Sequence, residues 1–429
     1  SSTVSRMEQL LPPSRASSLL NNTSLDASDL DDVVKQPAER VCGAGDQSEW
    51  LHVFPRIVSV GRWAARSPLA SRCCRWVYIC STLIIVLGTV VLPLALDRNG
   101  TMFAVKNYGE DDDDSSFSLP FVIFLAVEYV GYMALPFLLA PRISALLLSP
   151  LMPDLFATTA ELHLPSAEME SLKTRFHWLF VGSAAFTGIS MALYVSLTTR
   201  WGERAFAAFW WALYILPLGL LFSLLVCILE VHRVAARHLS AQVAASSLTL
   251  VSDTPPDSAE ALIECRIQQY CRLYDSCRHT SAICGHVLMI CVLVPVAMLV
   301  STIWSLYESY FSLESTASFA VMSLLYLILI GVAIATTNET GSLVRRELTG
   351  MLMRVLVAQR SLTSGSLSLA RSAAPAVSRE GLIKVNGFIG CLTFVRLEIC
   401  FFGEFALGSR ALLALVGSLL GAIIPGIVR

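Results

Sequence analysis

Long apolar segments recur along the chain and are separated by shorter polar ones. Each is roughly 18 to 25 residues long, the length that an α-helix needs to cross a hydrocarbon core of ~30 Å. Strand-type alternation of apolar and polar residues is absent from them, and lipid offers no partner to a free backbone N–H or C=O group, so each segment is expected to be a helix. The pattern predicts seven spans, at residues 76–96, 119–140, 176–197, 206–229, 283–304, 317–336 and 411–428.

The composition agrees with this pattern. Hydrophobic residues make up 55% of the 429 positions and charged residues only 15%, with a mean hydropathy of +0.62. Soluble domains carry about 25% charge. These values exclude a soluble enzyme, a nucleic-acid binder and a disordered chain, and they make the lipid bilayer the first expected partner.

Lysine and arginine are distributed unevenly between the loops. The loops on one side of the seven spans hold about 21 basic residues and those on the other side about 4, so the positive-inside rule places the first side in the cytoplasm. The N-terminus is then cytoplasmic and the C-terminus extracellular, in a multi-pass protein of the plasma membrane. G-protein-coupled receptors have the opposite orientation, and the expected spans contain neither a DRY nor an NPxxY-type signature.

The cytoplasmic side is expected to be largely helical. Asp257 and Glu260 form a capping-box pattern, and a stripe of apolar residues at helical spacing then runs into the fifth span. We predict cytoplasmic helices at about 230–245, 257–282, 342–360 and 380–402, which pack on one another or form a subunit interface. Residues 1–55, rich in Ser and Asp, are predicted to be a disordered cytoplasmic segment, and residues 56–429 the transmembrane domain.

Neither the cysteines nor the histidines indicate catalysis. None of the twelve cysteines falls in a predicted outside loop, so no disulfide framework is expected. Cys277, Cys284 and Cys291 are seven residues apart and are interpreted as small packing residues on one helix face. No Ser/His/Asp arrangement or metal-ligand spacing stands out. We therefore expect no enzyme activity, no metal and no cofactor.

The end of the chain carries a family resemblance. Residues 401–410 read FFGEFALGSR, and the apolar run that follows has Gly417, Ser418 and Gly421 on one face. Together with seven spans, a cytoplasmic N-terminus, long cytoplasmic helices and a short last helix, this resembles the insect chemoreceptor superfamily of gustatory and odorant receptors. The chain looks like a divergent gustatory receptor-like protein. The family's final helix has a central glycine, on which Gly417 falls, and closes on a TYxxxxxQF motif, whose Thr, Tyr, Gln and Phe positions hold Gly421, Ala422, Val428 and Arg429.

The resemblance implies a ligand-gated, non-selective cation channel assembled as a homo- or hetero-tetramer. In such a channel the last helix lines a central pore, the cytoplasmic helices form an anchor domain, and the ligand enters the outer half of the other helices. The altered terminal motif favours an alternative, a non-conducting membrane subunit or scaffold that keeps the fold. A transporter is disfavoured, because the sequence contains neither an internal repeat nor paired broken helices.

Two groups of candidate site residues follow. A stripe on the last helix is the candidate pore and gate, with lipid contact or packing as the other interpretation: Leu412, Leu415, Val416, Leu419 and Ile423. Aromatic and polar residues in the outer halves of the spans suit a small, mostly apolar ligand: Glu128, Tyr129, Thr187, Tyr194, Trp210, Trp211, Tyr214, Met322 and Tyr326. The tryptophans are alternatively interface anchors, whereas Glu128 is an acid near mid-membrane, where a charge is costly and usually functional.

Overall fold

The computed structural model describes the chain in segments. They are parts of 54–83, a few residues between 146 and 162, residue 208, and residues 164–197, 216–250, 256–307, 313–363, 377–401 and 405–428. The predicted N-terminal segment as far as residue 53, most of the first span and all of the second lie outside the described residues.

The described part is almost entirely helical. Its helices are α4 (Arg56–Arg66), α9 (Ser166–Leu197), α11 (Leu216–Thr249), α12 (Pro256–Tyr307), α13 (Leu313–Thr363), α14 (Arg379–Leu392) and α15 (Ser409–Val428). Two short strands, β1 (Cys400–Phe401) and β2 (Phe405–Ala406), pair antiparallel and join α14 to α15.

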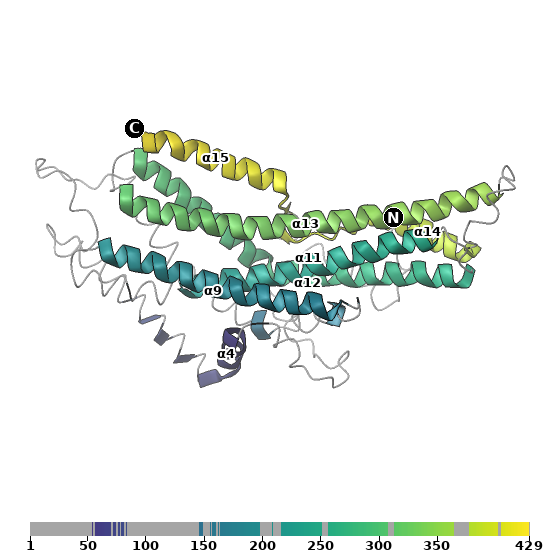
Figure 1. The fold of residues 1–429 in the computed structure, drawn as a ribbon, viewed down its shortest axis with the longest axis horizontal. Coiled ribbons are helices and arrows are strands. Elements are labelled where there is room, and N and C mark those ends of the chain that lie inside the picture. The colour runs from purple at the N-terminus through teal and green to yellow at the C-terminus, as the bar shows by residue number, and fades with distance from the viewer. Residues whose placement is uncertain are drawn as a thin grey trace, which may run out of the picture.

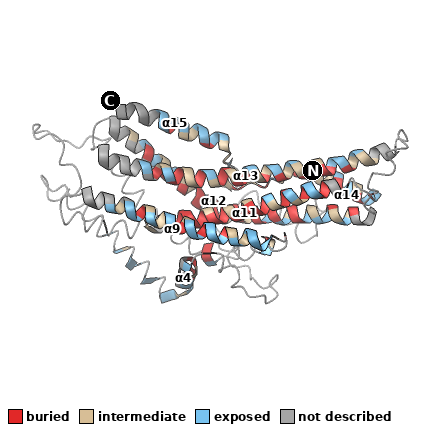
Figure 2. Cartoon of the chain, in the orientation of Figure 1, coloured by how far each residue is buried: buried red, intermediate tan, exposed pale blue. Residues whose placement is uncertain are grey.

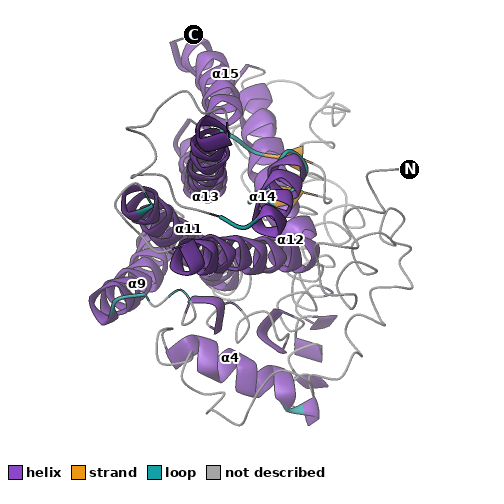
Figure 3. Cartoon of the chain, turned by 90° about the vertical axis from the view of Figure 1, so that its right-hand side faces the viewer, coloured by secondary structure: helices purple, strands orange, loops and turns teal. Residues whose placement is uncertain are grey.

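The long helices lie lengthwise beside one another (Figure 1). α13 packs against both α11 and α12, and α9 packs against α11. The faces that these helices turn toward one another carry most of the buried apolar side chains (Figure 2). α15 lies along one end of α12 and α13, and α14 packs on α13 near its other end (Figure 1). The short strands lie against α12 (Figure 3).

Membrane character, as predicted, is confirmed. Among the residues that the structure describes, three helical stretches are long and apolar enough to cross a membrane by length and composition: Gly219–Ser247, Ala259–Ala297 and Ser323–Gln359. They hold 29, 39 and 37 residues, although about 20 suffice to span a bilayer. The residues beyond these ~20 extend the longest stretch by roughly 25 Å or more outside the hydrocarbon core, because an α-helix rises about 1.5 Å per residue.

The structure changes one predicted helix. The helix expected at 380–402 ends at Leu392 in α14. The next residues form a turn and then an extended segment that leads into β1. Extended backbone is possible there because side chains of α12 and α13 supply the hydrogen bonds that a helix would otherwise make internally, which the local sequence pattern does not reveal.

Candidate functional site

A buried asparagine fastens the segment that precedes the last helix. Asn338 of α13 is 5% exposed, and its carboxamide makes three hydrogen bonds to the backbone of this segment. The Nδ2 group donates to the carbonyl oxygens of Ile399, at 3.2 Å, and Leu407, at 3.1 Å. The Oδ1 atom accepts from the N–H of Ile399 at 2.7 Å. One side chain thus holds both ends of the β1–β2 hairpin and fixes where α15 begins.

Two side chains of α12 hold the same segment from another direction. The Tyr270 hydroxyl donates to the carbonyl oxygen of Val395 at 2.9 Å. The Ser281 Oγ atom accepts from the N–H of Cys400 at 3.1 Å while donating to the carbonyl oxygen of Cys277 at 2.9 Å. The connection between α14 and α15 is therefore tied to both α12 and α13.

A glycine allows the backbone to come this close. A Cβ atom on Gly341 would lie 1.9 Å from the carbonyl oxygen of Leu397 and 2.9 Å from its Cβ atom. No real side chain tolerates such contacts, so α13 needs glycine where the segment crosses it. We call Tyr270, Ser281, Asn338 and Gly341 the linker clamp.

Two leucines pack the last helix against α12 and α13. Leu412 packs on Gly331 of α13, where a Cβ atom would lie 2.5 Å from Leu412 Cδ1. Leu419, about two helical turns after Leu412, is 7% exposed and forms a small apolar cluster with Leu299 of α12 and Leu327 of α13. These contacts decide which face of α15 is turned away from the bundle.

The free face of α15 is apolar and small-residue rich. Leu413 is 71% exposed and Leu420 38% exposed, although both are large apolar side chains. Beyond Arg410 at the start of the helix, the exposed positions among the described side chains of α15 are Ala411, Leu413, Ala414, Gly417, Ser418, Leu420 and Gly421. An apolar surface of this kind is normally covered by lipid or by another helix.

The predicted pore residues fall on the other side. Leu412 and Leu419 are buried against α12 and α13, and Leu415 and Val416 are partly buried. Ile423 lies in α15, where its side chain is not described. The pore assignment stays a prediction.

Three hydroxyl-bearing side chains of α9 and α13 converge on α11. A Cβ atom on Gly219 would lie 2.7 Å from Tyr326 Oη, 2.9 Å from Ser183 Oγ and 3.2 Å from Thr187 Oγ1. Thr187 Oγ1 donates to the carbonyl oxygen of Ser183 at 2.7 Å, so in its contact of 3.4 Å with Tyr326 Oη it is the acceptor. The ring of Phe222 stacks on Tyr326 with centroids 4.6 Å apart. We call Ser183, Thr187 and Tyr326 the hydroxyl cluster.

Two of the predicted ligand-contact residues thus come together, since Thr187 and Tyr326 share this cluster and are both buried. Tyr194 and Met322 lie in α9 and α13, where their side chains are not described. The other candidates lie outside the described residues: Glu128, Tyr129, Trp210, Trp211 and Tyr214.

A buried histidine was not singled out by the sequence pattern. His232 of α11 is 1% exposed, with its Nε2 atom 2.7 Å from Thr280 Oγ1 and its Nδ1 atom 3.6 Å from Cys277 Sγ. Within the described ranges no group of three or more His, Cys, Asp or Glu residues could hold a metal ion. The arrangement links α11 to α12 and offers no catalytic constellation.

Comparison with known proteins found no relative of this chain. No family model matches the chain, and no curated protein matches it. The linker clamp, the hydroxyl cluster and the free face of α15 are therefore the features from which a function is proposed.

Proposed function

We propose that the protein is a divergent gustatory receptor-like chemoreceptor of the plasma membrane. In this proposal it has seven spans, a cytoplasmic N-terminus and an extracellular C-terminus. Four copies, identical or mixed with related subunits, form a ligand-gated, non-selective cation channel whose last helices line a central pore.

The observation that carries the proposal is the placement of α15. It is a short apolar helix at the end of the chain, seated on α12 and α13 by Leu412 and Leu419 and held at its start by the linker clamp. Its other face exposes Leu413 and Leu420. A helix fixed on one side and apolar on the other suits a pore lining that subunits share around an axis.

The pore face is accordingly proposed to be the free one. Leu413, Gly417 and Leu420 follow one another at spacings of four and three and share a helix face. Rings of leucine at two levels close a narrow pore by excluding water. The ligand is proposed to be small and mostly apolar with a hydrogen-bonding group, because the hydroxyl cluster brings polar side chains of α9 and α13 together beside α11, inside an apolar surround.

A second function is favoured by the sequence of α15 itself. The family's terminal motif is replaced by Gly421, Ala422, Val428 and Arg429. A ring of arginines at the outer mouth of a pore would repel cations. These positions favour a non-conducting subunit or scaffold that retains the fold.

Current recordings from the full-length protein in planar bilayers test the proposal. Leu413→Ser and Leu420→Ser are expected to raise the basal current, because a hydroxyl lets water enter the closed constriction. Leu325→Ser is the matched control, since Leu325 is an exposed leucine (44%) that belongs to α13 and not to α15. A silent wild-type protein whose leucine variants are also silent would support the scaffold, and particle images without a central symmetry axis would exclude the pore.

A further inference from the structure

An ion cluster between α9 and α11 marks one end of the apolar part of the bundle. Glu230 Oε1 accepts from Arg175 Nη1 at 3.0 Å and from Arg233 Nη2 at 2.5 Å. Arg175 directly precedes the apolar run that begins at Phe176, and Glu230 directly follows the run that ends at Leu229. Charged side chains avoid the hydrocarbon, so this cluster lies at the level of the lipid headgroups.

The helix α4 is docked at the same level. The ring of Phe54, two residues before α4, lies 5.2 Å from the ring of Phe176. Phe54 and Val58 are both 5% exposed and belong to the main apolar core. One side of this N-terminal segment therefore packs beside α9, one residue from the ion cluster.

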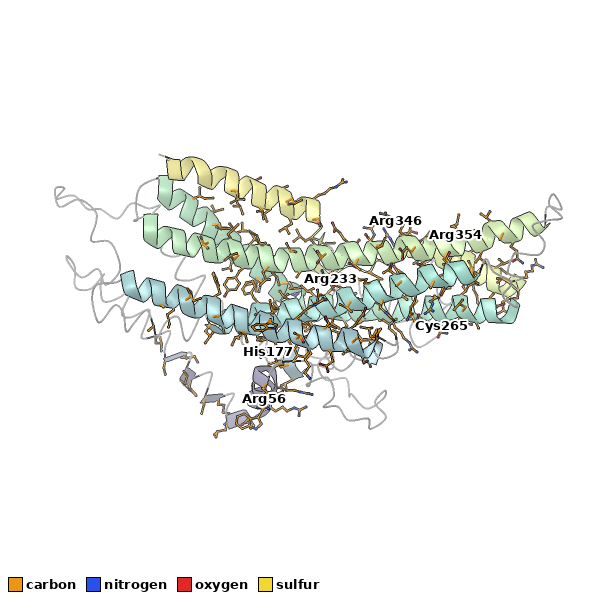
Figure 4. The ribbon with its side chains drawn as sticks, in the orientation of Figure 1. Arg56, His177, Arg233, Cys265, Arg346 and Arg354 are labelled. Atoms are coloured by element: carbon orange, nitrogen blue, oxygen red, sulfur yellow. The ribbon has the colours of Figure 1, made fainter. Side chains whose placement is uncertain are left out.

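The other side of α4 combines arginine with tryptophan. Arg56, Ser59, Trp63 and Arg66 follow one another at spacings of three, four and three, which places them on one helix face. Arg56, Trp63 and Arg66 are exposed, and Trp63 is 67% exposed. Figure 4 shows Arg56 on the opposite side of the bundle from Arg346 and Arg354 of α13. Tryptophan flanked by arginine is typical of a helix that lies in a membrane interface.

The charges in the sequence that flanks α4 are all of one sign. Residues 50–96 contain five arginines and no Asp or Glu. Burial, followed by the charge of Arg66, lowers the pKa of Arg62. Crowded positive charge is stabilised by a negatively charged surface, and each arginine near such a surface strengthens binding about fivefold.

We infer that α4 binds the headgroups of anionic phospholipids in the cytoplasmic leaflet through Arg56, Trp63 and Arg66. This inference depends on the orientation proposed above but not on ion conduction, so a non-conducting protein would bind the same lipids. The exposed face of α4 carries the Trp63 ring between the positive charges of Arg56 and Arg66, at the boundary of the apolar bundle. We therefore take the bound partner to be a lipid surface rather than a protein.

Lipid retention by the full-length protein tests the inference. The wild-type protein and its variants are released from mixed phosphatidylcholine and phosphatidylserine membranes, and the retained lipids are counted by native mass spectrometry. Arg56→Gln/Arg66→Gln is expected to lower the preference for phosphatidylserine roughly 25-fold, as the product of two fivefold losses. Arg56→Lys/Arg66→Lys is expected to preserve most of it, because the charge is kept.

The matched control is Arg379→Gln/Lys384→Gln on α14. Both side chains are exposed, and α14 lies at the end of the bundle opposite α15 (Figure 1). This pair removes the same charge but should leave lipid preference unchanged. The inference is overturned if the wild-type protein retains both lipids equally, or if the α14 variant loses as much preference as the α4 variant. It also fails if the α4 substitutions change the oligomeric state and leave lipid preference unchanged, because that result identifies a second copy as the occupant.

Discussion

Replacing Asn338 by leucine should detach the segment before α15 from α13. Leucine keeps a similar volume but removes all three hydrogen bonds to Ile399 and Leu407. Each buried backbone group left without a partner costs about 1–3 kcal/mol. The lower limit of that range gives about 3 kcal/mol for three groups, which corresponds to roughly a 100-fold shift in the equilibrium between the clamped and open segment.

Hydrogen–deuterium exchange of the full-length protein in nanodiscs measures this shift. The amide of Ile399, whose N–H donates to Asn338 Oδ1, should exchange at least about 100-fold faster in the variant. Gln359→Leu is the matched control, because Gln359 is a carboxamide on the same helix that makes an equivalent pair of bonds to the backbone of Val377. It should loosen the chain near Val377 and leave Ile399 protected.

Two outcomes would contradict the clamp. In the first, Asn338→Leu leaves the exchange of Ile399 within about threefold of the wild type, which corresponds to less than about 1 kcal/mol and means that the bonds contribute almost nothing. In the second, Asn338→Leu accelerates exchange equally throughout α11 and α12, which means that the change is global unfolding rather than local opening.

The remaining predictions concern single sites. Gly341→Ala should lower the melting temperature strongly because its Cβ atom would overlap the carbonyl of Leu397, whereas Gly350→Ala, with open space around its Cβ, should be neutral or stabilising by about 0.5–1 kcal/mol in thermal melts. Gly219→Ala should push apart the hydroxyl cluster and weaken any ligand response more than it lowers the melting temperature. Cys265 is exposed, whereas burial raises the pKa of the half-buried Cys391 thiol. Maleimide should therefore label Cys391 more slowly than Cys265 near neutral pH, and the labelling of Cys391 should become faster as the pH rises. Mass spectrometry of the labelled peptides measures both rates.

The apolar core helices could be predicted from the sequence because their signal is long. A run of about 20 apolar residues has one stable solution in lipid, so the spans within α11, α12 and α13 follow from hydropathy alone. The extension of these helices beyond the membrane also has a local signal, namely a continuing stripe of apolar residues such as Ile263 and Leu273, both of which are buried.

The linker clamp could not be predicted in the same way. Asn338 has the sequence of a glycosylation sequon, and nothing local indicates that its carboxamide pairs with residues 61 and 69 positions later. The extended course of residues 395–401 depends on those tertiary bonds, so the local sequence pattern predicts a longer helix than α14. Asn338 also lies among other polar residues, including Thr336, Thr337, Glu339 and Thr340, so no local contrast in polarity marks it.

The face of α15 is also beyond sequence reasoning, for a different reason. The helix is apolar all round, so hydrophobic periodicity does not distinguish the seated side from the free side. The choice is made by its neighbours: Gly331 provides room for Leu412, and Leu299 and Leu327 surround Leu419. A stripe selected for its leucines alone therefore includes residues that pack on the same chain.

One helix carries both ends of the proposed signal. Tyr326 of the hydroxyl cluster and Asn338 of the linker clamp both belong to α13, twelve residues apart, or about 18 Å along the axis. The stretch between them is α-helical without a break, so a displacement at Tyr326 is carried to Asn338 as movement of a rigid element. Because Asn338 bonds both sides of the β1–β2 hairpin, α15 must follow α13 or the bonds must break. The clamp therefore adds to the direct contacts of Leu412 and Leu419 with α13, and in Asn338→Leu a ligand that binds at the hydroxyl cluster should have a weaker effect on α15.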